Sequence, residues 1–160
     1  MNRVAVLGCG GSGKTTLARR LGAALGAPVI HLDTIYYDAA WNPLPQDVFA
    51  AAQRGLVAAP RWVIDGNYAA TLPIRLAAAD TVIFLDLPAP ACLLGIARRR
   101  LRREHHRVNG EFLRYVWRYR RTMAARVRAL IAAHAGDADV HIVRSRRAAN
   151  RIGPYGPASV

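Results

Sequence analysis

The sequence has only one lysine, Lys14, and arginine serves every other basic position among its 160 residues. It is also short of acid, because ten Asp and Glu residues stand against 23 Lys and Arg and leave a formal net charge of +13. Such a balance favours polyanionic partners: nucleotides, nucleic acids or anionic membranes. Lys14 is thus the one basic position with a compact ammonium charge on a flexible side chain, in place of the planar guanidinium of arginine.

Cysteine and long hydrophobic runs are scarce as well. Cys9 and Cys92 are the only cysteines, too few for a disulfide framework or a cysteine zinc site. Apolar runs such as 81–85 are far too short to span a bilayer, and no apolar stretch follows a basic leader. We therefore expect a cytoplasmic protein without a membrane partner.

The composition is that of a folded domain. Hydrophobic residues make up 52% of the chain and charged residues 21%, which is globular rather than disordered composition. The length fits one domain with a sizeable core. We expect a single domain over residues 1–152, and a flexible tail over 153–160, which holds two prolines and two glycines.

The lysine lies in a glycine-rich motif. Residues 8–15 fit G-x-x-x-x-G-K-[ST], the P-loop that cradles nucleoside triphosphate phosphates. The apolar run 3–7 before it reads as a buried strand, and leucines spaced by four over 16–25 predict a helix after it. Strand, glycine loop and helix follow in the order that the motif requires.

Each part of the motif has a predicted role. Backbone N–H groups and the helix N-terminus hold the phosphates, Lys14 reaches the β- and γ-phosphates, and Thr15 ligates Mg²⁺. The expected donor-site residues are Gly8, Gly10, Gly11, Ser12, Gly13, Lys14, Thr15 and Thr16.

The rest of the chain alternates strand-like and helical segments, which predicts an α/β fold with a parallel sheet covered on both faces. The predicted strands after the first are 28–32, 61–64, 81–85 and 140–143, and the predicted helices after the first are 46–59, 73–79, 89–103 and 111–134. Ligands bind at the carboxyl ends of such strands. Asp33, Asp65, Asp86 and Arg144 all fall there.

Three acids compete for roles in phosphoryl transfer. Asp65 and Asp86 are alternatives for the acid that holds the water shell of the metal ion. Asp65 is favoured because Gly66, the next residue, permits close approach of the backbone. Asp33 could orient or deprotonate an acceptor hydroxyl. Each of the three could instead cap a turn or helix. The aromatic residues near 36–41 and Tyr68 could form an acceptor pocket or pack over the core.

Arginines crowd the stretch 98–128, where Glu104 and Glu111 are the only acids. Part of this charge belongs to a solvated face, but a lid over about 98–121 could also bring arginines to the transition state. The lid candidates are Arg98, Arg102, Arg118 and Arg121. After the last strand, Arg144 and Arg146 could flank a loop that holds adenine.

Taken together, these motifs resemble the small bacterial proteins known as adenylate kinase-like or DNA topology modulation proteins. The residues that carry the resemblance are 8–16, His31-Leu32-Asp33, Asp65-Gly66-Asn67-Tyr68 and the helix 112–121. The resemblance implies the nucleoside monophosphate and shikimate kinase fold, a three-layer P-loop domain whose five-stranded parallel sheet has the order 2-3-1-4-5. It also implies that Asp33 binds the acceptor.

Two departures from those kinases concern the acceptor. Monophosphate kinases follow Asp-Gly with an aromatic residue and proline, where this chain has Asn67-Tyr68, and His31 stands where shikimate-type kinases place a further acid. The sequence predicts a P-loop kinase that moves the γ-phosphoryl of MgATP to a nucleotide or other hydroxyl-bearing metabolite. A nucleic-acid-binding NTPase and a nucleotide-binding regulatory protein without turnover remain the alternatives.

Overall fold

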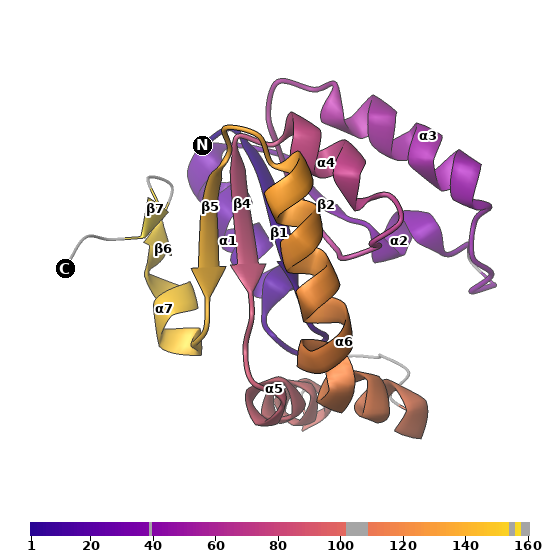
Figure 1. Cartoon of the computed structure of the whole chain (residues 1–160), viewed down its shortest axis with the longest axis vertical. Coiled ribbons are helices and arrows are strands. Elements are labelled where there is room, and N and C mark those ends of the chain that lie inside the picture. Colours follow the sequence, from indigo (N-terminus) through magenta and orange to yellow (C-terminus); the bar gives the residue numbers. More distant parts are fainter. Residues whose placement is uncertain (39, 102–108, 154–155, 158–160) are drawn as a thin grey trace.

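A five-stranded parallel sheet forms the centre of the structure, a computed structural model that describes residues 1–38, 40–101, 109–153 and 156–157. The strand order is β2-β3-β1-β4-β5 (Figure 1), which confirms the order implied by the resemblance. The strands are β1 (Arg3–Gly8), β2 (Val29–His31), β3 (Trp62–Asp65), β4 (Thr81–Leu85) and β5 (Asp139–Val143).

The three inner strands form the core. Residues 4–7 of β1 are wholly buried, as are most of β3 and β4, which is why each strand reads as a continuous apolar run rather than an alternating one. In the register of the sheet, Val6 pairs with Asp65 and Gly8 pairs with Leu85. The residues that follow β1, β3 and β4 therefore emerge side by side at one edge.

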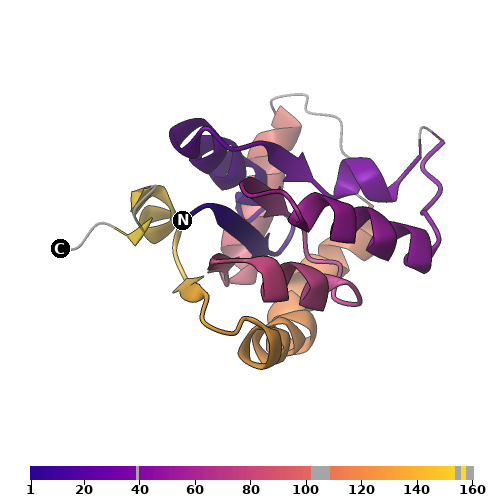
Figure 2. The ribbon, with the colours of Figure 1, turned by 90° about the horizontal axis from the view of Figure 1, so that it is seen from above.

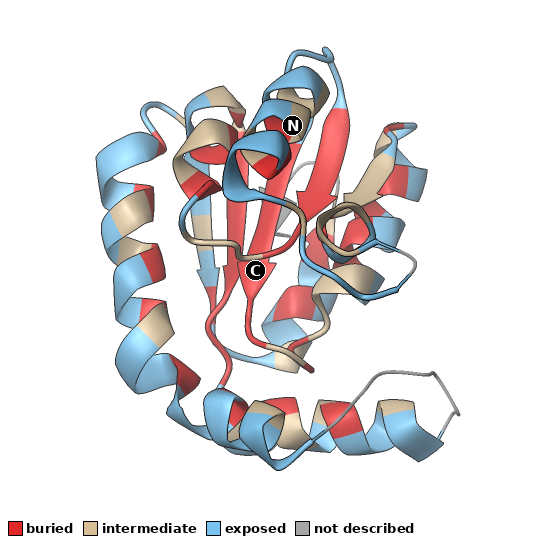
Figure 3. Cartoon of the chain, turned by 90° about the vertical axis from the view of Figure 1, so that its right-hand side faces the viewer, coloured by how far each residue is buried: buried red, intermediate tan, exposed pale blue. Residues whose placement is uncertain are grey.

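Helices cover both faces of this sheet. In Figure 2, α1 lies on one face, where it packs against β1, β2 and β3, while α3, α4 and α6 lie on the other. Figure 3 shows buried residues gathered in the sheet and on the helix sides turned toward it. The helices are α1 (Lys14–Leu25), α2 (Asp33–Tyr36), α3 (Gln46–Val57), α4 (Leu72–Ala78), α5 (Ala89–Leu101), α6 (Gly110–His134) and α7 (Arg146–Arg151).

Two short helices stand where the sequence indicated loops. Asp33 opens α2 and is separated from the end of β2 only by the N-cap residue Leu32, so its carboxylate lies on a helical turn. After β5, Ser145 caps α7 by accepting a hydrogen bond from the N–H of Ala148 at 3.1 Å. Beyond α7, Ile152–Gly153 (β6) pairs with Gly156–Pro157 (β7) in a small antiparallel ladder.

Within the described residues, none of the helices combines the length and apolar character that a bilayer crossing requires. The predicted helix 89–103 corresponds to α5, and its last two residues lie outside the described residues. The two cysteines are buried and free of disulfide bonds.

Candidate functional site

The P-loop joins β1 to α1 at the carboxyl edge of the sheet. Lys14 is the first residue of α1, and its ammonium donates a hydrogen bond across the loop to the carbonyl oxygen of Cys9 at 3.1 Å. The loop is therefore closed on itself by a hydrogen bond from its own lysine.

Helix α5 presses directly on this loop. A side chain at Gly95 would place its Cβ 2.1 Å from the carbonyl oxygen of Gly11, so only glycine allows the approach. Arg146 from α7 secures the contact, because Nη2 donates to the carbonyl oxygens of Gly11 at 2.7 Å and Ala91 at 2.9 Å. Arg146 thus braces the loop, whereas Arg144 is exposed.

The turn after β3 is tied to the start of the P-loop by Asn67. Its Oδ1 accepts from the N–H of Gly8 at 2.9 Å, and its Nδ2 donates to the carbonyl oxygen of Gly8 at 2.8 Å. Arg75 of α4 holds the same turn from behind, since Nη2 donates to the carbonyl oxygens of Gly66 at 3.1 Å and Asn67 at 2.6 Å. Sequence patterns gave no sign of either contact.

Arg75 is an unusual support because its side chain is fully buried. Its Nη1 donates to Oε1 of Gln53, which in turn donates through Nε2 to the hydroxyl of Thr71 at 2.7 Å. Burial lowers the pKa of the Arg75 guanidinium from 12.5 to about 9. The hydrogen bonds of its two Nη atoms go to neutral oxygens, so the guanidinium serves to position the turn.

The two competing acids have different surroundings. Asp86 is buried and paired with two arginines of α6, Arg120 at 3.3 Å through Nε and Arg128 at 2.7 Å through Nη2. Asp65 contacts Nδ1 of His31 at 3.0 Å through Oδ1, while its buried Oδ2 has no hydrogen-bond partner. Only Asp65 retains an oxygen for a further group.

Asp33 faces the same edge from α2. The hydroxyl of Tyr68 donates to its Oδ1 at 2.6 Å, and burial, followed by this contact with Asp33, raises the pKa of Tyr68. Tyr68 therefore stays protonated as a donor. Its ring is held by Tyr36 and Phe49, with centroids 4.7 and 4.9 Å away.

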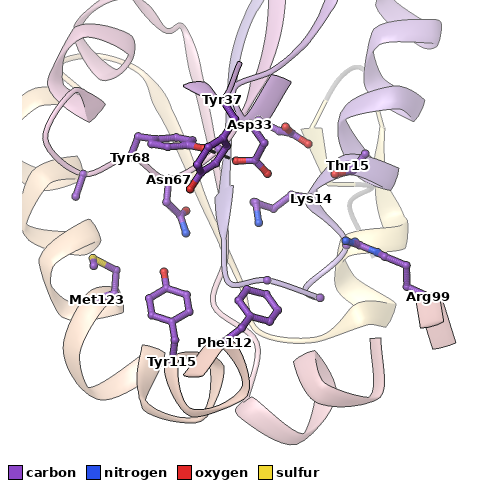
Figure 4. A pocket seen from close by; sticks show the side chains of 16 residues that line it. Lys14, Thr15, Asp33, Tyr37, Asn67, Tyr68, Arg99, Phe112, Tyr115 and Met123 are labelled. Carbon is purple, nitrogen blue, oxygen red and sulfur yellow. Dashed lines mark hydrogen bonds between the residues drawn. The ribbon is translucent and has the colours of Figure 1, made fainter. Parts of the chain in front are cut away.

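A cavity of about 410 Å³ connects these groups, and we call it the P-loop cavity. Figure 4 shows Asp33, Tyr37, Asn67 and Tyr68 on one side of Lys14, with Phe112, Tyr115 and Met123 across from them. Its lining residues are Gly10, Gly11, Gly13, Lys14, Thr15, Asp33, Tyr37, Asp65, Gly66, Asn67, Tyr68, Ala69, Arg99, Phe112, Tyr115 and Met123.

Most of the predicted donor and acid residues meet in this cavity. Gly8, Ser12 and Thr16 lie in or beside the loop but are not part of the lining. The hydroxyl oxygen of Ser12 is buried without a hydrogen-bond partner. The aromatic side chains from α6, Phe112 and Tyr115, were not predicted as site residues.

The predicted lid arginines are distributed differently. Arg99, which the sequence did not single out, lines the P-loop cavity, while its neighbour Arg98 is exposed outside it. Arg118 and Arg121 line a separate cavity of about 690 Å³, here called the outer cavity, together with Trp117. Arg102 lies outside the described residues.

The residues fit a magnesium ion held mainly by phosphate and water. Among the described residues, no three His, Cys, Asp or Glu side chains gather into a metal cage. Mg²⁺ usually needs only one or two protein oxygens beside nucleotide phosphates. Thr15 and the unpartnered Oδ2 of Asp65 supply such oxygens at the cavity.

Comparison with solved structures finds this fold in small-molecule kinases. Shikimate kinase from Acinetobacter baumannii, in complex with shikimate, matches with TM-score 0.61 and 19% identity over 93% of this chain and 87% of that one. A gluconokinase from Sinorhizobium meliloti 1021 matches with TM-score 0.56 and 17% identity over 93% and 85%. A sugar kinase from Janibacter sp. HTCC2649 matches with TM-score 0.56 and 16% identity over 90% and 85%.

No protein-family profile matches the chain, and no curated protein matches its sequence. At 16 to 19% identity the structural likeness shows the fold. The chain has the three-layer P-loop kinase fold that the sequence predicted.

Proposed function

We propose that this protein is a kinase that transfers the γ-phosphoryl group of MgATP to a hydroxyl group of a small molecule. One observation carries the proposal: a single cavity is lined by Lys14 and Thr15 of the P-loop and by the carboxylates of Asp33 and Asp65. Phosphoryl transfer requires this combination of phosphate cradle, metal ligand and acceptor acid. The kinases among the structural neighbours support the same reaction class.

On the donor side, the backbone N–H groups of residues 10–14 and the N-terminus of α1 would bind the phosphates. Lys14 would exchange the Cys9 carbonyl for the β- and γ-phosphate oxygens. Arg99, which lines the same cavity as Thr15 and lies on the same side of Lys14 in Figure 4, would stabilise negative charge in the transition state.

Magnesium, when bound, would neutralise the charge on the β- and γ-phosphate oxygens. The hydroxyl of Thr15 would ligate it, and Oδ2 of Asp65 would hold a water of its shell. Asp86 is unsuited to that role because arginines occupy both of its carboxylate oxygens. His31 would keep Asp65 oriented through Oδ1.

On the acceptor side, Asp33 would accept the hydrogen bond of the reacting hydroxyl, with Tyr68 fixing the carboxylate. The acceptor oxygen attacks the γ-phosphorus, and the bond from that phosphorus to the β,γ-bridging oxygen breaks. ADP leaves with the electron pair of that bond. The hydroxyl proton passes to Asp33, which acts as a general base.

The proposal is tested by incubating the protein with MgATP and pooled metabolites and searching by mass spectrometry for a compound heavier by one phosphoryl group. Lys14→Ala should lose the product and bind ATP more weakly. Arg19→Ala is the matched control, because it removes one exposed cation from α1 outside the cavity. If Lys14→Ala binds ATP as tightly as the wild type, the assignment of the site is wrong.

A second candidate function, nucleic-acid binding, is favoured by the outer cavity. Arg118, Arg120, Arg121 and Arg128 line it, and Trp117 beside them is 63% exposed. A basic groove with an exposed aromatic ring suits single-stranded nucleic acid. Fluorescence anisotropy with a labelled oligonucleotide would then detect binding that weakens steeply with salt and ATP turnover that the oligonucleotide stimulates.

A further inference from the structure

The P-loop cavity has a charged half and an aromatic half. In Figure 4, Thr15 and Arg99 lie on one side of Lys14, and Asn67, Tyr68 and Tyr115 lie on the other. Since the P-loop fixes the triphosphate, the aromatic half is the space left for the acceptor. Asp33 lies at its boundary, where the reacting hydroxyl would meet the γ-phosphate.

The acceptor half holds no cation among the residues that the structure describes. Lys14 and Arg99 are the cations of the described lining: Arg99 lies in the donor half, and Lys14, a P-loop residue that the triphosphate would engage, lies at the boundary between the halves. Arg75 stands behind the turn after β3, and both ends of its guanidinium are bonded to Gln53 and to backbone carbonyls. Within the part of the chain that the structure describes, a phosphate or carboxylate on the acceptor would therefore face Asp33 without a counter-charge beyond the boundary residue Lys14.

Such an arrangement strongly disfavours anionic acceptors. Moving a charged group out of water is costly unless an opposite charge or hydrogen bonds replace its hydration. Asn67, the amide of this half, already binds Gly8 through both of its polar atoms. Among the described side chains of this half, the polar groups that remain are the carboxylate of Asp33, the second N–H of the Asn67 amide and the phenol groups, which suit hydroxyl groups rather than anions.

The aromatic rings of this half are held in place by their neighbours. Tyr68 packs on Tyr36, and Tyr115 lies nearly parallel to Phe112, whose ring rests against Gly10 of the P-loop; their interplanar angle is 26° and their centroids are 6.4 Å apart. Tyr37 contacts Trp41 with centroids 5.2 Å apart. Aromatic rings offer large apolar faces with polar tips, which favours an acceptor with a flat or C–H-rich ring.

We propose that the acceptor is an uncharged ring compound bearing hydroxyl groups, with the chemistry shared by nucleosides, neutral sugars and cyclitols. This inference rests on the proposed function and narrows its substrate class. The hydroxyl oxygen gains the phosphoryl group, its proton passes to Asp33, and ADP departs. Nucleoside monophosphates and sugar acids should be poor acceptors because their anionic groups meet no cation among the described residues of this half.

Matched pairs of compounds test the inference: adenosine with AMP, glucose with gluconate, and inositol with shikimate. Binding is measured by calorimetry in the presence of Mg²⁺ and a non-hydrolysable ATP analogue, and transfer is measured separately as ADP formation with MgATP. In at least one pair the neutral member should bind about tenfold tighter or more. Tighter binding of the anionic members, or no binding of any neutral member, overturns the inference.

The two readouts separate this inference from the proposed function. Neutral compounds that bind but are never phosphorylated would refute kinase activity and leave the uncharged ligand class standing. Anionic compounds that are phosphorylated in preference to their neutral partners would refute the ligand class and leave kinase activity standing.

A charge placed in the acceptor half provides a second test. Met123→Arg adds a guanidinium to the lining, and Thr122→Arg adds the same charge at the neighbouring exposed position. Met123→Arg should improve binding of the anionic member by about tenfold, whereas Thr122→Arg should change it little. Equal effects of the two variants would contradict the inference, because the anion would then be responding to overall charge.

Discussion

Asn67→Ala tests the contact that joins the acceptor side of the site to the P-loop. The wild-type amide bridges the N–H and the carbonyl oxygen of Gly8 at 2.9 and 2.8 Å. Gly8 is buried, so both of its polar groups lose their partner in the variant. The turn after β3 would also lose its attachment to the end of β1.

The expected loss follows from the two broken bonds. Leaving a buried donor or acceptor unsatisfied costs about 1–3 kcal/mol, and partial access of water to the new space reduces the sum. We expect the free energy of unfolding to fall by about 2–4 kcal/mol. For a chain of this length the melting temperature should fall by roughly 5–15 °C.

Urea denaturation followed by circular dichroism measures this loss. Asn150→Ala is the matched control, because Asn150 is exposed on α7 and its truncation should change stability by less than about 0.5 kcal/mol. Asn67→Asp keeps an acceptor for the Gly8 N–H but sets a carboxylate against the Gly8 oxygen, so it should also be destabilised. A loss below about 1 kcal/mol for Asn67→Ala would refute the reasoning.

Three further predictions concern the two acids, the loop contact and alkaline stability. Asp65→Asn should weaken MgATP binding about tenfold with little loss of stability, whereas Asp86→Asn should lower stability by about 1–3 kcal/mol and leave MgATP binding unchanged. Equilibrium dialysis measures the binding and urea titration measures the stability. The reverse pattern would assign the water shell of the metal to Asp86. Gly95→Ala sets a Cβ 2.1 Å from the Gly11 carbonyl oxygen, so it should lower the melting temperature and reduce the further rise produced by ATP; an undiminished rise would contradict the contact. Burial raises the pKa of Tyr115 from 10.0 to about 12. The contribution of the neutral phenol to folding stability is therefore complete below pH 10.0 and is lost as the pH approaches about 12. In urea titrations Tyr115→Phe should flatten this decline of stability with pH, and an equally steep decline in the variant would count against the shift.

The sheet strands and the glycine loop between β1 and α1 could be predicted because their signals are local. The runs 3–7 and 81–85 are apolar throughout, as strands buried on both faces must be. The P-loop motif gives the order of strand, loop and helix in a few adjacent residues. The strand order came from the resemblance to known kinases, and the structure confirms it.

Contacts between distant segments could not be read in the same way. Asn67 meets Gly8 across 59 positions, and no periodicity marks that pairing. Arg98 and Arg99 are neighbours on a helix that turns by about 100° per residue, so the packing of α5 alone decides which one lines the cavity. The side of α6 that carries Arg118 and Arg121 is likewise set by its docking on α5 and α4.

The short helix α2 was missed for a related reason. Its residues 33–36 lie in a segment rich in aromatic residues and turn formers, and four residues are too few for a helical repeat to show. The prediction that Asp33 faces the site did not depend on this detail. Its contact with Tyr68 depends on the turn after β3, which sequence patterns do not place.

Transfer of the γ-phosphoryl group is the central claim, and mass spectrometry of the reaction products tests it most directly. Protein, MgATP labelled with ¹⁸O in the γ-phosphoryl group, and a pool of neutral hydroxyl compounds should yield ADP and one labelled phosphorylated compound. Lys14→Ala should yield neither, and Arg19→Ala should yield both. If the label appears only in inorganic phosphate with every acceptor tested, or if Lys14→Ala retains the full yield, the account is contradicted.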